Sequence, residues 1–124
     1  MEYYTYANKG ALKYISGLTD AGKAAPILFA PKGVAGIEKG ALKDATAKAF
    51  VVGKGTAAFN LANGVFADCS ANLYIDGSCA TTDVTCGATL LEGSNAKIYV
   101  GASAYQNFKD DYTWGKLSDS MKKY

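Results

Sequence analysis

Three turn signals divide the middle of this chain into short apolar runs. The dipeptides Asn63-Gly64 and Asp76-Gly77 favour tight two-residue turns, in which both central positions need a positive φ. A longer loop signal follows at 92–95, with the sequence Glu-Gly-Ser-Asn. If each run pairs with the next, the chain forms hairpins in series. The spacing therefore predicts a mainly β fold, an antiparallel meander closed as a sandwich or a small barrel.

The predicted strands are short. They lie at 57–61, 65–67, 73–75, 88–91 and 96–100, with two more upstream at 26–30 and 48–52. In the last of the five, Ala96, Ile98 and Val100 alternate with Lys97 and Tyr99. Alternation of this kind is typical of a strand with one buried face and one solvated face.

The C-terminal segment has helical periodicity instead. Trp114, Leu117, Met121 and Tyr124 fall at i, i+3, i+7 and i+10. Aspartates early in this segment and lysines late in it suit the helix dipole. We therefore expect one helix over 105–123, or two short ones broken near Gly115.

The N-terminal segment is ambiguous. Leu12, Ile15 and Leu18 have helical spacing, but Gly10 and Gly17 argue against a stable helix. A hairpin turning at 8–10 is the alternative, and the sequence leaves both open.

The 124 residues predict a single domain, 1–124, large enough to bury a core without metal or disulfide. We divide it into an N-terminal arm (1–24), a β core (25–104) and a C-terminal helical segment (105–124). The pentapeptide Lys-Gly-Ala-Leu-Lys occurs at 9–13 and 39–43. Nothing similar follows either copy, so no repeat architecture is predicted.

Two residue types are missing, and their absence excludes much chemistry. The chain has no histidine, and all 13 basic residues are lysine. Without histidine there is no Ser-His-Asp triad and no histidine ligand for zinc. Without arginine there is no bidentate clamp on phosphate. The net charge is only +2, and the lysines form no basic stripe, so we expect no specific nucleic-acid partner.

Three cysteines, Cys69, Cys79 and Cys86, have the spacing C-x₉-C-x₆-C. Zinc sites favour cysteine pairs two to four residues apart, so we predict no metal, although the chain contains the residue types for a Cys₃-Asp site. A Cys79–Cys86 disulfide is the alternative if the protein leaves the cell. No histidine activates a thiol nucleophile. We expect small, partly buried thiols in or beside strands.

Neither the acids nor the glycines predict a catalytic or cofactor site. Eleven acids could supply the carboxylate pair of a glycosidase, but the aspartates cluster in turns and near helix starts, where they cap. The glycines at 33 and 36, and at 53 and 55, match no phosphate-binding motif. We therefore assign no catalytic residue and no cofactor.

The aromatic residues are the remaining candidates. Tyr3, Tyr4 and Tyr6 precede the first recognisable core element, and left free they would be an exposed apolar liability. Together with Trp114 and Tyr124 they are our candidates for contacts between subunits, because such rings give rigid contact area. A sugar-stacking platform is the alternative for the same residues.

The N-terminal residues have no basic start and no apolar run, so no signal peptide is predicted. No stretch approaches about 20 apolar residues, so no membrane span is predicted either. We expect synthesis in a reducing cytosol.

The whole chain, rich in alanine, glycine and tyrosine and without catalytic machinery, resembles small bacteriophage virion structural proteins: capsid decoration or cement proteins, head-fibre bases or tail components. The resemblance is one of overall character and includes no motif, so no residue role is transferred. It implies a non-enzymatic, self-assembling homo-oligomer within the virion, with other copies and a capsid-like assembly as partners and no cofactor. A carbohydrate- or surface-binding β module using Trp114 and exposed tyrosines, and a small carboxylate-dependent hydrolase, are the alternatives.

Overall fold

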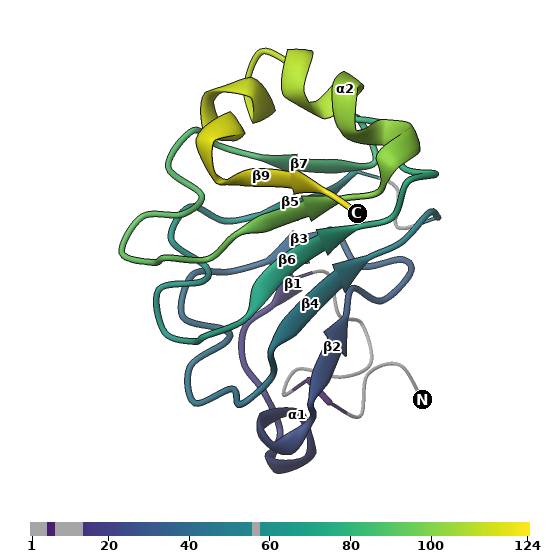
Figure 1. Ribbon diagram of the computed structural model, residues 1–124. Helices are drawn as coiled ribbons and strands as arrows, with labels where there is room; N and C mark the ends of the chain where they lie inside the picture. The colour runs from purple at the N-terminus through teal and green to yellow at the C-terminus, as the bar shows by residue number, and fades with distance from the viewer. Residues whose placement is uncertain (1–4, 7–13, 56–57) are drawn as a thin grey trace.

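The computed structural model describes residues 5–6, 14–55 and 58–124, and shows two β-sheets in which every strand pairing is parallel (Figure 1). One sheet has the order β1-β3-β5-β7, with β1 Tyr14–Ile15, β3 Gly36–Ile37, β5 Phe59–Leu61 and β7 Val84–Cys86. The other has the order β2-β4-β6-β8-β9, with β2 Ile27–Phe29, β4 Ala49–Val52, β6 Asn72–Ile75, β8 Ile98–Val100 and β9 Met121–Lys123.

The chain visits the two sheets alternately from β1 to β8, so each strand pairs with the strand two places further on. Ile27 lies opposite Ala49 in one sheet, and Phe59 lies opposite Val84 in the other. Each round of about two dozen residues is therefore one coil, which adds one strand to each sheet. Coils stacked in this way define a parallel β-solenoid.

The antiparallel meander predicted from the turn signals is wrong. Asn63-Gly64 lies in the connection from β5 to β6, and Asp76-Gly77 lies between β6 and β7. These connections join strands of different sheets, so the flanking strands never pair with each other. Gly64 has a positive φ of +73°, but Asn63, Asp76 and Gly77 do not, so neither dipeptide forms the predicted turn with two positive φ values. Gly93, in the loop at 92–95, has a φ of +72°. The chain turns where expected, but it turns a corner between sheets instead of closing a hairpin.

Some of the segments predicted as strands form strands in the structure, and others form corners. Those at 26–30, 48–52, 57–61, 73–75 and 96–100 correspond to β2, β4, β5, β6 and β8. The segments 65–67 and 88–91 are corners, and β1, β3 and β7 were not predicted. Among the described residues, antiparallel pairing is confined to an isolated bridge between Tyr6 and Leu18.

The core is built from side chains stacked at equal register positions of successive coils. One stack, 5% exposed or less throughout, contains Leu28, Phe50, Leu73, Ile98 and Met121. The other sheet contributes a facing stack of Ile15, Ile37 and Leu61. Between the sheets, the Phe50 ring lies 6.1 Å from the Phe59 ring. Because every coil repeats the same inward position, burial of one coil depends on its neighbours.

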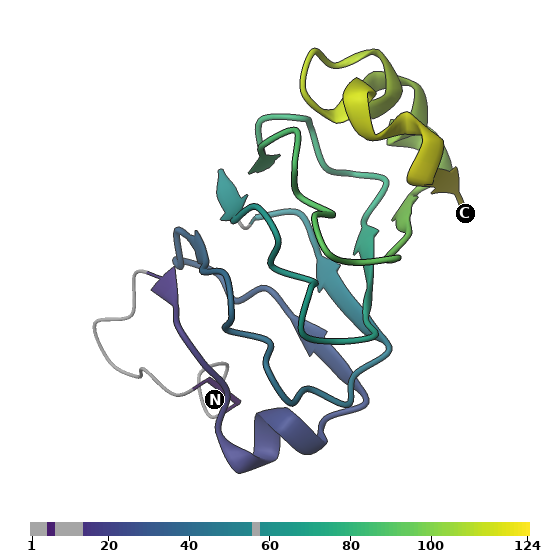
Figure 2. The same ribbon diagram turned by 90° about the vertical axis from the view of Figure 1, so that its left-hand side faces the viewer.

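Helical segments lie at the two ends of the stack (Figure 2). Helix α1 (Asp20–Ala24) begins at Thr19, whose side chain accepts a hydrogen bond from the Gly22 amide. Helix α2 (Ala102–Asp110) and the 3₁₀-helix η1 (Trp114–Ser120) lie at the other end. Helix occurs where the C-terminal periodicity predicts it, but the break falls at 111–113 and not at Gly115, and the last residues form β9. The turn predicted at 8–10 lies outside the described residues.

Candidate functional site

The outer face of the five-stranded sheet carries a row of large side chains at one register position. The row consists of Phe29, Val51, Tyr74, Tyr99 and Lys122. The rings of Tyr74 and Tyr99 stack face to face, with centroids 4.8 Å apart and planes 14° apart. Phe29 is 60% exposed. The row is therefore packed on itself in its middle coils and open to solvent at β2.

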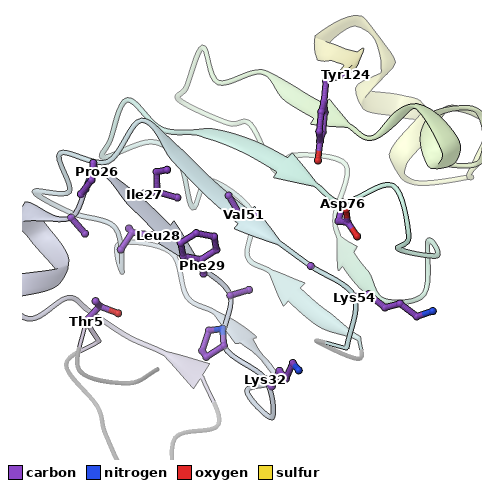
Figure 3. Close-up of a pocket in the computed structure, with 14 residues that line it drawn as sticks. Thr5, Pro26, Ile27, Leu28, Phe29, Lys32, Val51, Lys54, Asp76 and Tyr124 are labelled. Atoms are coloured by element: carbon purple, nitrogen blue, oxygen red, sulfur yellow. The ribbon is translucent and has the colours of Figure 1, made fainter. Parts of the chain in front are cut away.

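A groove of about 770 Å³ lies over the open part of this row (Figure 3). Its lining runs along β2 and its flanks from Ala25 to Lys32 and includes Thr5, Val51, Gly53, Lys54, Asp76 and Tyr124. Ile27 and Phe29 are the exposed apolar side chains of β2, at 46% and 60%. Tyr124, 56% exposed, reaches the groove from the C-terminal end of the fold.

Gly53 leaves space in the groove that the fold itself does not need. A Cβ built on Gly53 would meet no heavy atom within 4 Å. Its φ is not positive, so the backbone there suits other residues too. By contrast, a Cβ on Gly101 would lie 2.4 Å from the amide nitrogen of Gly77, so close packing excludes a side chain there. Position 53 therefore has room for a β-carbon, and glycine there leaves this part of the groove open.

The charged side chains lining the groove are Lys32, Lys54 and Asp76. The two lysines follow the carboxyl ends of β2 and β4. The Asp76 carboxylate accepts hydrogen bonds from the Ser78 hydroxyl and from the Ser78 amide, the latter at 3.3 Å. The Ser78 hydroxyl is the main reason why the pKa of Asp76 lies below its usual value. Asp76 is therefore bound within its own turn and stays ionised, so the lining side chains carry two positive charges and one negative charge.

The three cysteines are free thiols, so the structure contains no Cys79–Cys86 disulfide. Burial, followed by the charges of Asp83 and Asp76, raises the pKa of Cys79 to about 11. Burial and then Asp111 raise the pKa of Cys86 to about 12. A thiol that holds its proton in this way is a poor nucleophile and a poor metal ligand at neutral pH. Within the described ranges, no three cysteine or acidic side chains come together as metal ligands would.

The interface candidates from the sequence lie in different places. Tyr6 and Trp114 are only 1% and 2% exposed, so both side chains belong to the interior. The Tyr6 hydroxyl donates to the Phe29 carbonyl oxygen, and the Trp114 indole donates to the Val84 carbonyl oxygen. Tyr124 is exposed and lines the groove. Tyr3 and Tyr4 lie outside the described residues.

Sequence reasoning did not single out Ile27, Phe29, Gly53 and Lys54 as site residues. A usable signal was present at 26–31, where prolines flank a strand with Leu28 in its centre. If Leu28 points inward, alternation places Ile27 and Phe29 on the outer face. Two large apolar residues on the solvated face of a strand indicate a contact surface.

Comparison of the chain with protein-family models, with curated proteins and with solved structures found no match. A separate finding concerns membranes: in the part of the chain that the structure describes, each helix is too short or too polar to cross a bilayer.

Proposed function

We propose that this protein is a non-enzymatic structural subunit that attaches to a larger, multi-copy protein assembly through the groove at β2. The assembly that we favour is a bacteriophage virion, in which the protein would act as a decoration or cement component. The observation that carries this proposal is the exposure of Phe29 and Ile27 side by side on the outer face of β2.

Exposed apolar groups gathered in one place mark contact sites on soluble domains. Elsewhere on the same face, the outward positions are occupied by polar residues, by half-buried side chains such as Val51, or by rings packed on one another. Lys97 and Lys122 are exposed, and Tyr74 is packed against Tyr99 and against the edge of Tyr124. An aromatic anchor such as Phe29 at the centre of a contact supplies much of the binding energy of protein interfaces.

Two features of the groove favour attachment over the alternatives. Asp76 carries the one side-chain carboxylate among the described lining residues, whereas a glycosidase needs two that flank the bond to be cleaved. A sugar platform needs open ring faces, but Tyr74 and Tyr99 cover each other's faces. Phe29 and Tyr124 remain as rings that a sugar could contact, which makes glycan binding the outcome to test against.

The experiment compares the wild type with an Ile27→Ser/Phe29→Ser variant in co-sedimentation with particles from the organism that encodes the chain. We expect the wild type to sediment with the particles and the variant to stay free while keeping its circular dichroism spectrum. The matched control is Tyr112→Ser, which removes a ring that is 83% exposed on the C-terminal segment. Equal sedimentation of variant and wild type, or glycan-array binding by a protein that joins no particle, would refute the proposal.

A further inference from the structure

We infer that the groove receives an extended segment of a partner protein in which an apolar side chain lies next to a carboxylate. This inference rests on the proposed attachment function and specifies the chemistry of the partner. It follows from the shape of the groove, from its apolar surface and from the charges at its end.

The shape favours a chain segment. A volume of about 770 Å³ is within the range of roughly 300–1,000 Å³ found for small-molecule sites. Such sites usually enclose their ligands, but here Phe29 and Tyr124 are more than half exposed, so the groove is open along its length. An open groove on a sheet face suits an extended segment that lies across it.

The apolar surface of the groove favours a partner segment that carries an apolar side chain. Ile27, Phe29 and Val51 form one continuous surface at adjacent register positions of β2 and β4. The space over Gly53 lies beside Val51 and is not needed by the fold. A leucine or phenylalanine side chain of the partner fits this space and would remove both its own surface and that of Phe29 from water.

The charges of the groove determine which kind of residue in the partner should lie next to that apolar side chain. Lys32 and Lys54 lie at the end of the groove where β2 and β4 finish, and Figure 3 shows both side chains there. Both hydrogen bonds from Ser78 end on Oδ2 of Asp76, so this carboxylate stays charged and offsets one of the two lysines. An acidic segment is attracted to this end, and a basic one is repelled.

The expected affinity of one groove is low. A stable interface buries about 800 Å² on each partner, and one short segment buries only part of that area. In a multi-copy assembly, many weak contacts act together, and their combined strength exceeds that of each contact alone. A weak, acidic and apolar segment therefore agrees with the proposed structural role.

The test uses two capped peptides, acetyl-Leu-Phe-Glu-amide and acetyl-Leu-Phe-Lys-amide, titrated into the labelled full-length chain and followed by amide chemical shifts. We expect the glutamate peptide to bind about three- to fivefold more tightly, the advantage typical of exposed charge pairs. The shifts should centre on Val51, Gly53 and Lys54. The preference should weaken in Lys54→Gln and disappear at high salt, and it should persist in Lys97→Gln, the matched control elsewhere on the same face.

Two further variants test the location. Gly53→Leu places a side chain over this part of the groove, where a Cβ meets no heavy atom within 4 Å, so it should keep the fold and abolish binding of both peptides. Phe29→Ser removes the main wall and should weaken both peptides equally. Equal affinity for the two peptides, unchanged binding by Gly53→Leu, or shifts centred elsewhere would overturn the inference. Peptide discrimination without attachment to particles would refute the proposed function alone, and attachment without discrimination would refute this inference alone.

Discussion

The indole Nε1 of Trp114 donates a hydrogen bond to the carbonyl oxygen of Val84 at 3.1 Å. Val84 belongs to β7, the outermost strand of the four-stranded sheet, so its carbonyl has no further strand to pair with. The Trp114 ring also packs edge-on against Phe108, at 5.3 Å between centroids. The C-terminal helical segment thus closes one end of the solenoid with a single aromatic residue that is both apolar cover and hydrogen-bond donor.

We predict that Trp114→Phe destabilises the protein by about 1–3 kcal/mol, because the Val84 carbonyl loses its donor in a buried place. Trp114→Ala should cost about 3–5 kcal/mol, since it also leaves a cavity. Urea unfolding measures both. Tyr112→Ala, at an 83% exposed position, is the control and should stay within about 0.5 kcal/mol of the wild type.

Tyr6 has the corresponding role near the other end. Its hydroxyl donates to the Phe29 carbonyl oxygen of edge strand β2, and its ring is buried. We predict that Tyr6→Phe costs about 1 kcal/mol and Tyr6→Ala about 3–5 kcal/mol in thermal or urea unfolding. A Tyr6→Ala variant as stable as the wild type would show that residue 6 is a dispensable arm.

The buried thiols make the free energy of unfolding depend on pH in the alkaline range. Burial raises the folded pKa of Cys79 and Cys86 to about 11 and 12, above the unfolded value of 9.0, so the folded state holds these protons more tightly. Their contribution is complete below pH 9 and is lost as the pH rises toward 11–12. We predict that stability falls over this range by at most about 1.4 kcal/mol per pH unit for each thiol.

The comparison for that prediction is the triple variant with Cys69, Cys79 and Cys86 changed to alanine. It should fold, with a modest loss of stability at neutral pH, and its stability should fall less steeply above pH 9. A thiol reagent at pH 8 should react slowly with the native wild type and quickly in urea. Rapid reaction of a native thiol would contradict the raised pKa values.

The solenoid predicts an unusual tolerance to deletion. Segments 40–48 and 64–72, which lie one coil apart, match as Gly-Ala-Leu-Lys-Asp-Ala-Thr-Ala-Lys and Gly-Val-Phe-Ala-Asp-Cys-Ser-Ala-Asn. Removing 40–63 deletes one coil and joins equivalent corners, so β2 should pair with β6. We expect a shorter, less stable protein that still unfolds cooperatively, as seen by circular dichroism. Removing 40–51 instead deletes half a coil, sends later strands to the wrong sheet and should abolish folding.

Local features of the fold were predictable, and the pairing was not. The alternation at 96–100 shows correctly that Ala96, Ile98 and Val100 are buried. The chain leaves its strands at the predicted turn signals, but among the residues of the two dipeptides only Gly64 has the predicted positive φ. A turn signal does not say whether the next strand returns to the same sheet, since that depends on the residues a full coil away. The degenerate match of 40–48 with 64–72 carries this information, but the identical pentapeptides at 9–13 and 39–43 are the more conspicuous pair and obscure it.

The candidate site was harder to predict for the same reason. Phe29, Gly53 and Tyr124 are far apart in sequence and line one groove because β2, β4 and β9 belong to one sheet. Trp114 and Tyr6 are conspicuous residues in the sequence. Both are buried because they lie near the ends of the solenoid, and no local sequence pattern predicts where those ends are. Among the described interface candidates, Tyr124 is the exposed one, at 56%.

The stacked register has a consequence for how this surface can vary. Successive coils are about 4.8 Å apart, and each contributes one residue to the outward row of Phe29, Val51, Tyr74 and Tyr99. The outward row can therefore vary one coil at a time. One substitution changes the residue that one coil contributes, and an added coil lengthens the row without changing the residues already present.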